Sequence, residues 1–227
     1  MNLELKPIIY SNGNGLTDLL DVKKQYIPYG PDSNVMNSLE VKDYVKQAFD
    51  LLMGVDSEVK ESQKYFTKMC RDYNVPHFQI HGIAVIVLGE HFFELAYADI
   101  NDKLPGSIDG FADRYEFHNE RGNAYILEWD LPSVMQTIGH EIGHLMGESM
   151  SDAVVEEAKA YAFETAWGRV IKENNIAGLA NTHIGELGYS SSAIHSKAIN
   201  LLKERLDAGY EPLDLFYKIG ELGRLPD

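Results

Sequence analysis

Apolar residues in the first part of the chain recur at helical spacing. Those between Ser38 and Gly54 recur every three to four residues, and serine is a residue type that often begins a helix. The sequence therefore predicts a helix over this range. The same spacing predicts a second helix from Ser57 to about Asp72, after which Pro76 interrupts the chain.

The middle of the chain contains the segments that most favour β-structure. Residues 78–88 (FQIHGIAVIVL) are largely β-branched and apolar, which predicts a strand. A turn directly after it would lead into a partner strand over 91–98, followed by a polar loop over 99–121. Another short strand is expected over 123–128 (NAYILE).

The second half of the chain is predicted to be mostly helical. Asp130 suits a helix N-cap and Pro132 suits the first turn, so a helix is expected to run from there to about Met146 and to end at Gly147. Further helices are predicted over three ranges: 152–174, 190–209 and from 211 onward. Because the helices are grouped around a small sheet and do not alternate with its strands, we expect an α+β fold.

We expect two subdomains with a cleft between them. Residues 1–147 would form a sheet-and-helix subdomain that ends with the helix after Asp130, and residues 148–227 would form a helical C-terminal subdomain. The first 35 residues contain several turn-forming residues, and the sequence leaves their role open.

Composition and charge exclude several classes of protein. Lys and Arg number 20 and Asp and Glu 35, which gives a formal net charge of −15. Such a surface repels phosphate groups, so neither nucleic acid nor a membrane is expected as a partner. The apolar fraction of 44% is enough for a buried core, and no apolar run is long enough to span a bilayer. The single cysteine, Cys70, excludes an internal disulfide, and with no secretory signal visible we expect a cytoplasmic protein.

The sequence HEIGH from His140 to His144 fits the pattern H-E-x-x-H within a predicted helix. Residues four apart lie one above the other on a helix, so both imidazoles can bind one metal ion. Glu141 is then a carboxylate close to the metal, where it can accept a proton from a water molecule. Gly139 and Gly143 lack side chains, which would let another backbone or a substrate come close.

A catalytic zinc ion needs a third protein ligand. The metzincin continuation H-E-x-x-H-x-x-G-x-x-H is excluded, because Met150 stands at the position of the third histidine. The next helix offers Glu157, which is followed by small residues that would allow the two helices to approach closely. Glu156 and Glu164 stay open as alternatives, and Asp152 is expected to be a helix cap.

The H-E-x-x-H motif at His140, followed by EAKAYAF from Glu157, resembles the gluzincin metallopeptidases. It is most similar to the ImmA/IrrE-type group, whose second motif resembles E-A-N-x-F-A. Lys159 stands where that group often has Asn. The resemblance covers about residues 123–165 and implies a zincin-like fold, with a small mixed sheet, backing helices, an active-site helix and a helical C-terminal part.

These features predict a zinc-dependent metallopeptidase that acts on a peptide or protein. Zn²⁺ would be held by His140, His144 and Glu157, and a metal-activated water with Glu141 as general base would hydrolyse the peptide bond. The resemblance also implies that the strand at 123–128 borders the cleft and binds the peptide by strand addition. The alternative is a non-catalytic zincin-fold regulatory or interaction protein with a structural zinc ion.

Other histidines and tyrosines carry weaker signals. A donor to the developing oxyanion is expected downstream of the motif, and the sequence does not decide between His183 and Tyr189. His195 is interpreted as a core residue, because Ile199 and Leu202 follow it at helical spacing.

Overall fold

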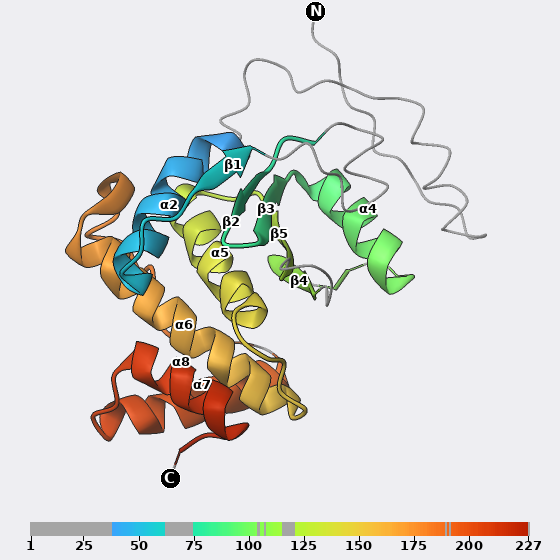
Figure 1. The fold of residues 1–227 in the computed structure, drawn as a ribbon. Coiled ribbons are helices and arrows are strands. Elements are labelled where there is room, and N and C mark those ends of the chain that lie inside the picture. The colour runs from blue at the N-terminus through green and yellow to red at the C-terminus, as the bar shows by residue number, and fades with distance from the viewer. Residues whose placement is uncertain are drawn as a thin grey trace, which may run out of the picture. The chain divides into compact units, whose positions relative to one another are not determined.

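The computed structural model shows helices grouped around a small mixed sheet, which confirms the α+β class (Figure 1). The structure describes residues 38–61, 75–103, 105–106, 108–114, 121–188, 190 and 192–226. The helices in this part of the chain are α2 (Ser38–Met53), α4 (Glu90–Asn101), α5 (Leu131–Leu145), α6 (Ala153–Glu173), α7 (Ala193–Asp207) and α8 (Pro212–Leu222), with a 3₁₀ turn at Ile176–Gly178. The strands are β1 (Val59–Glu61), β2 (Phe78–Ile80), β3 (Ile83–Leu88), β4 (Gly110–Arg114) and β5 (Gly122–Leu127).

The sheet has the strand order β1-β2-β3-β5-β4. Only the β3–β5 pair is parallel, and the other neighbouring pairs are antiparallel. β5 therefore lies between two strands, and the expectation that residues 123–128 form the strand at the border of the cleft is wrong. Among the described residues no further strand pairs with β4, so β4 forms that edge of the sheet.

The run 78–88 was expected to be one strand, but it is a hairpin of β2 and β3. His81 and Gly82 connect the strands, with φ values of 51° and 80°. Two successive residues with positive φ match the twist of a two-residue hairpin turn. Residues on both sides of the turn are mostly apolar, so little in the sequence indicates it.

The expected partner strand over 91–98 is also wrong, because this segment lies within helix α4. Phe93 and Ala96 are buried one turn apart, which is a helical and not a strand pattern. Parallel strands need a crossover connection, and α4 forms part of the connection from β3 to β5. The polar loop expected over 99–121 in turn contains strand β4.

Helices α4 and α5 lie on opposite faces of the sheet. Gly110 of β4 faces α5, since a Cβ atom there would lie 2.5 Å from Cγ2 of Thr137. The next residue, Phe111, points to the other face, where its ring lies 5.3 Å from that of Phe93 and 5.1 Å from that of Tyr97. Successive residues of β4 therefore alternate between the two helices.

The second helix expected from Ser57 is wrong at its start, where Val59–Glu61 pair with β2 as strand β1. The remainder of that prediction, including Cys70, lies outside the described residues. The other predicted helices and the strand at 123–128 are confirmed. Asp130 caps α5 by accepting a hydrogen bond from Ser133 N at 2.9 Å, and Asp152 caps α6 by accepting one from Val154 N at 2.8 Å.

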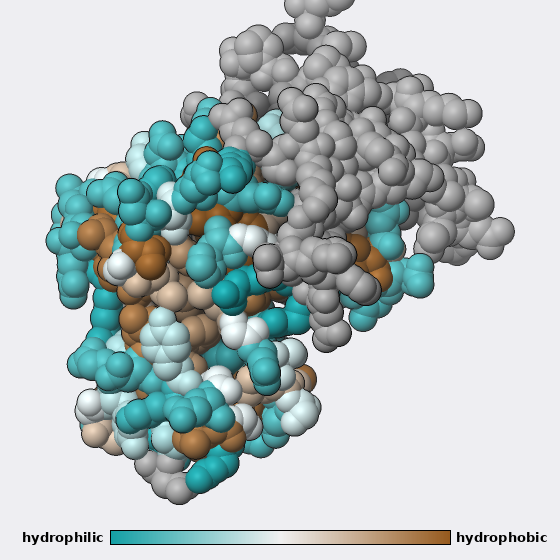
Figure 2. All heavy atoms as spheres, viewed as in Figure 1, coloured by the Kyte–Doolittle hydropathy of each residue, from teal (hydrophilic) through white to brown (hydrophobic). Residues whose placement is uncertain are grey.

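The core lies between the sheet and helices α2, α5 and α6. Val134, Ile138 and Ile142 of α5 are fully buried in it and recur at helical spacing. Hydrophilic residues cover most of the visible face of the described part, with smaller apolar areas between them (Figure 2). Within the described residues, no helix combines the length and the apolar character that a membrane crossing needs.

Candidate metal centre

Helix α5 carries the H-E-x-x-H residues, and its packing determines where they point. Because Val134, Ile138 and Ile142 face the core, His140 and His144 project from the other side of the helix into a cavity. The cavity has a volume of about 820 Å³, and its walls come from α5, α6, β4 and the start of α7.

Two glycines allow α6 to lie directly against α5. A Cβ atom at Gly143 would lie 3.0 Å from the Cα of Ala160, and one at Gly139 would lie 2.5 Å from Cδ1 of Trp167. The close neighbour at both glycines is therefore helix α6. This approach brings Glu157 of α6 opposite the two histidines.

Three side-chain atoms converge in the cavity. His140 Nε2 lies 3.2 Å from His144 Nε2, and Glu157 Oε2 lies 3.3 Å and 3.7 Å from these two atoms. Ligand atoms bound tetrahedrally to zinc at about 2.0–2.1 Å are about 3.3 Å apart, so these distances fit one ion. Among the described residues Glu157 Oε2 has no hydrogen-bond partner although it is buried, which is costly for a carboxylate unless a cation binds it.

The outer ring nitrogen, Nδ1, of each imidazole contacts a further glutamate. His140 Nδ1 lies 2.9 Å from Glu164 Oε2, and His144 Nδ1 lies 2.9 Å from Glu156 Oε1. These contacts direct both Nε2 atoms toward Glu157. Glu156 and Glu164, the alternative third ligands, therefore face the outer nitrogens, as partners of metal-binding histidines commonly do.

The ionisable groups of the cluster change one another's pKa values. Burial opposes a positive charge on His140, but the Glu157 and Glu164 carboxylates outweigh it and raise the pKa of His140 well above its usual value. Burial likewise opposes the charged form of Glu157, but the neighbouring His140 and His144 imidazoles lower its pKa. Burial would also raise the pKa of Glu156, yet hydrogen bonds from His144, Met150 N and Lys159 lower it to about 2. A protonated imidazole neutralises the negative charge of these carboxylates in the metal-free protein. A bound divalent cation would neutralise the same charge.

Glu141 lines the cavity beside the histidines and is only 5% exposed. Burial raises the pKa of its carboxyl group. The edge strand comes very close here, since a Cβ atom at Gly110 would lie 2.8 Å from Glu141 Oε1. A group bound along β4 would therefore lie next to the Glu141 carboxylate.

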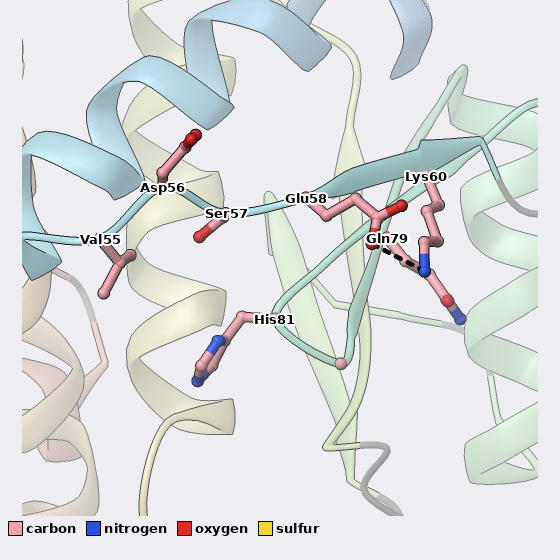
Figure 3. Close-up of a pocket in the computed structure, with 8 residues that line it drawn as sticks. Val55, Asp56, Ser57, Glu58, Lys60, Gln79 and His81 are labelled. Carbon is pink, nitrogen blue, oxygen red and sulfur yellow. Dashed lines mark ion pairs between the residues drawn. The ribbon is translucent and has the colours of Figure 1, made fainter.

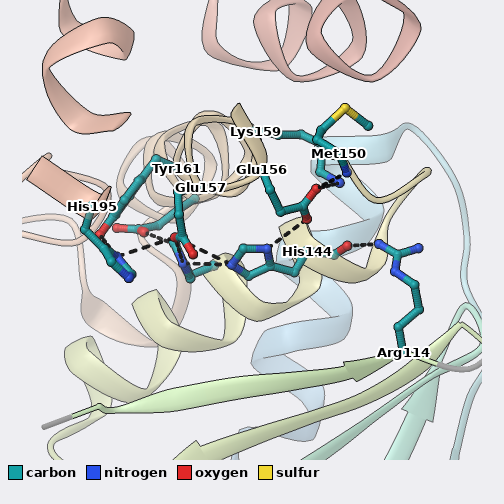
Figure 4. A network of polar contacts seen from close by, with 10 residues as sticks. Arg114, His144, Met150, Glu156, Glu157, Lys159, Tyr161 and His195 are labelled. Atoms are coloured by element: carbon teal, nitrogen blue, oxygen red, sulfur yellow. Dashed lines mark hydrogen bonds and ion pairs between the residues drawn. The ribbon is translucent and has the colours of Figure 1, made fainter. Parts of the chain in front are cut away.

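The sequence interpretation of His195 is wrong, because this residue lies in the cavity wall with a side chain that is 36% exposed. His195 Nδ1 is 2.9 Å from Tyr161 Oη and 3.4 Å from Glu157 Oε2, and Figure 4 shows Glu157 between His195 and His144. The apolar residues that follow His195, Ile199 and Leu202, are buried as expected. His195 itself lies in the first turn of α7, where its side chain lines the cavity. The spacing from Glu157 to Tyr161 is one helical turn, and this signal could have identified Tyr161.

Of the two candidate oxyanion donors from the sequence, the structure describes only His183, which is not part of this cluster. His183 has a side chain that is 97% exposed, and it pairs with Glu186 at 3.1 Å. Tyr189 lies outside the described residues. Tyr161 and His195, which contact each other in the cavity wall, are candidate donors that the structure adds, and His195 lies 3.4 Å from Glu157.

Arg114 connects the edge strand to the end of α5. Its guanidinium group donates a hydrogen bond to the carbonyl oxygen of His144 (Figure 4). It donates another to the carbonyl oxygen of Gly147 at 2.6 Å. A cation at this position also complements the negative end of the α5 helix dipole. β4 and the histidine helix are therefore fixed to each other at this end of the cavity.

A second cavity, of about 410 Å³, lies between the end of α2 and the β2–β3 turn (Figure 3). Lys60 and Glu58 on its wall pair with each other at 2.9 Å. His81 is the only histidine among the described residues that line it. The convergent donor atoms are thus found in the larger cavity.

No protein-family model, curated protein or solved structure matches the chain. The chemistry of the site therefore follows from its own donor atoms. Two imidazole nitrogens and one buried carboxylate oxygen form a set that suits zinc, with a second carboxylate, Glu141, alongside.

Proposed function

We propose that this chain is a zinc-dependent metallopeptidase of the gluzincin type with a zincin-like fold. The observation that carries the proposal is the convergence of His140 Nε2, His144 Nε2 and Glu157 Oε2 within 3.2–3.7 Å of one another. These three residues would hold the ion and leave its fourth position open to the cavity. Fe(II) also binds two histidines and one carboxylate, so elemental analysis has to identify the metal.

Zinc bound here would polarise a substrate carbonyl and lower the pKa of a water molecule. Glu141, which lines the cavity beside the histidines, would accept a proton from that water and return it to the leaving amine. Its raised pKa suits a group that must do both. His195 Nδ1 can donate a hydrogen bond to Tyr161 Oη, which leaves the hydroxyl proton of Tyr161 available to the developing oxyanion.

The edge strand β4 supports binding of an extended peptide. Leu127 N donates to Asp109 O at 2.8 Å, so these two residues form a hydrogen-bonded pair that extends the β4–β5 register by one residue. Hydrogen bonding alternates along antiparallel strands, and the backbone groups of Gly110 and Ala112 therefore point away from β5. A substrate strand that pairs with them would pass beside Glu141.

One observation favours the alternative of a regulatory or interaction protein with a structural zinc ion. His195 Nδ1 lies 3.4 Å from Glu157 Oε2, so His195 can be considered as a fourth protein ligand. That arrangement would close the site, as in structural zinc centres. The contact of the same Nδ1 with Tyr161 Oη at 2.9 Å favours the open site. X-ray absorption spectroscopy of the zinc-bound protein distinguishes three from four protein ligands.

The substitution Glu141→Gln tests the proposed reaction. It keeps the size of the side chain and removes the base, so we expect normal zinc content and about 10²- to 10⁴-fold slower cleavage of a mixed peptide library. Glu173→Gln, which replaces an exposed glutamate of α6, is the matched control and should cleave at the wild-type rate. Full activity of Glu141→Gln would exclude Glu141 as the base. Absence of metal from wild-type protein purified without chelators would overturn the metal site itself.

A further inference from the structure

Lys159 is a buried lysine of α6, and its side chain is 1% exposed. Its Nζ donates a hydrogen bond to Glu148 O at 2.7 Å and another to Glu156 Oε2 at 2.9 Å. A buried ammonium group is costly unless it is paired and hydrogen-bonded. These two contacts therefore have to be maintained when α6 packs against α5.

Glu156 connects this ammonium group to a proposed zinc ligand. Its Oε2 accepts hydrogen bonds from Lys159 and from Met150 N, the latter at 2.7 Å, while its Oε1 lies 2.9 Å from His144 Nδ1 (Figure 4). Three contacts thus fix the plane of the carboxylate. The carboxylate in turn orients the imidazole of His144, whose Nε2 faces His140 and Glu157.

The imidazole of His140 is oriented by a different set of contacts. Glu164, behind His140, accepts a hydrogen bond at 2.6 Å from the neutral amide of Gln136. The Glu156 carboxylate, which contacts His144, instead accepts a hydrogen bond from the buried ammonium group of Lys159. Lys159 and Glu156 also form hydrogen bonds with the backbone of the linker between α5 and α6. The same two side chains therefore fix both the linker and His144.

We propose that Lys159 is a positioning residue of the metal site, which fixes Glu156 against His144 Nδ1 and so keeps His144 Nε2 directed at the metal. The inference rests on the proposed function, because it requires metal bound by His140, His144 and Glu157. Outer partners of metal-binding histidines change metal affinity by about 10- to 100-fold. If Lys159 acted only through its charge, its removal would change zinc affinity in the opposite direction. Loss of a nearby positive charge would tighten the binding of a cation.

The test compares Lys159→Met with Lys172→Met. Lys172 is also on α6 and also pairs with a glutamate, Glu186, at 2.8 Å, but Glu186, unlike Glu156, does not line the cavity. The zinc dissociation constant is measured by competition with a chromophoric chelator, and the geometry by the visible absorption of the Co²⁺-substituted protein. We expect Lys159→Met to weaken zinc binding at least about tenfold and to shift the cobalt bands. Lys172→Met should change neither.

A double-mutant comparison separates positioning through Glu156 from a general structural effect. In a Glu156→Gln background, Lys159→Met should change the zinc dissociation constant by less than about twofold, because the group through which Lys159 acts is already altered. A change as large as in the wild-type background would overturn the inference.

The remaining outcomes are also decisive. Wild-type protein that binds no zinc overturns the proposed function and this inference with it. Wild-type protein that binds zinc, with equal or tighter binding by Lys159→Met, overturns this inference alone. If circular dichroism shows that Lys159→Met does not fold, Lys159→Gln replaces it. Its shorter side chain cannot reach both Glu148 O and Glu156, so unchanged affinity in that variant likewise overturns the inference.

Discussion

Gly143 of α5 lies directly against Ala160 of α6, so that a Cβ atom at Gly143 would be 3.0 Å from both the Cα and the carbonyl oxygen of Ala160. This contact helps to set the distance between the two helices. It therefore also helps to set the distance between the histidines of α5 and Glu157 of α6. The geometry of the proposed metal site depends on a position that carries no side chain.

Replacement of Gly143 by alanine should separate the helices. Alanine normally stabilises a helix interior by about 1 kcal/mol relative to glycine, but overpacking against a backbone costs about 1–3 kcal/mol. We expect Gly143→Ala to lower both the melting temperature and the zinc affinity. Gly220→Ala is the control, because a Cβ atom there meets no atom of the described residues within 4 Å, and it should raise the melting temperature. Equal stabilisation by both substitutions would contradict the close contact.

Strand addition along β4 can be tested with proline. The backbone N–H of Ala112 points away from β5, so Ala112→Pro should remove a hydrogen bond to substrate while the β4–β5 ladder remains. We expect a higher KM for peptides and little loss of zinc. Asp113→Pro, one residue further, removes a bond of the ladder itself and should lower the melting temperature. A KM that Ala112→Pro leaves unchanged would argue against this binding mode.

The hydroxyl of Tyr161 is expected to stabilise the oxyanion. Tyr161→Phe should lower kcat by about 10²- to 10³-fold, the usual effect of removing one oxyanion donor, with KM and zinc content close to wild type. Tyr217→Phe changes an exposed tyrosine of α8 and serves as the control. Steady-state kinetics on a defined peptide distinguishes the two variants. A change confined to KM would place Tyr161 in substrate binding only.

Zinc binding should depend on pH through His140. Its pKa is raised above the ordinary 6.5 by Glu157 and Glu164 despite burial, so the metal has to displace a proton at neutral pH. Zinc affinity should therefore rise with pH up to that raised pKa, and calorimetry in buffers of different ionisation enthalpy should detect proton release. For the metal-free protein the sign is opposite: stability from protonated His140 is complete below pH 6.5 and is lost as pH rises through the raised pKa. Metal-free protein whose melting temperature rises over that range would contradict the assignment.

The local parts of the site could be predicted from the sequence because they depend on neighbouring residues. The cap at Asp130 and the helix that follows it were predicted from residue type, and both are confirmed. The spacing of four between His140 and His144 already places both imidazoles on one side of that helix. Small residues on α6 and the two glycines of α5 indicated that the helices could approach closely.

The parts that depend on contacts between distant segments could not be predicted. Whether Glu156, Glu157 or Glu164 meets Nε2 depends on how α6 is rotated against α5, which no local pattern specifies. The hairpin turn at His81 needs a positive φ at a residue that is not glycine, and sequence gives little warning of it. The edge strand at 110–114 has weak alternation and is defined mainly by its pairing with β5.

The parallel pairing of β3 with β5 also bears on the order in which the molecule folds. These strands can meet only after the chain between them, which includes α4 and β4, has crossed over the sheet. Helices α5 and α6 are joined by the short segment 146–152, so their association costs less loop-closure entropy. We therefore expect the helical pair that carries the histidines and Glu157 to associate early in refolding. Such an intermediate would be able to take up metal before the proposed substrate-binding edge at β4 has formed.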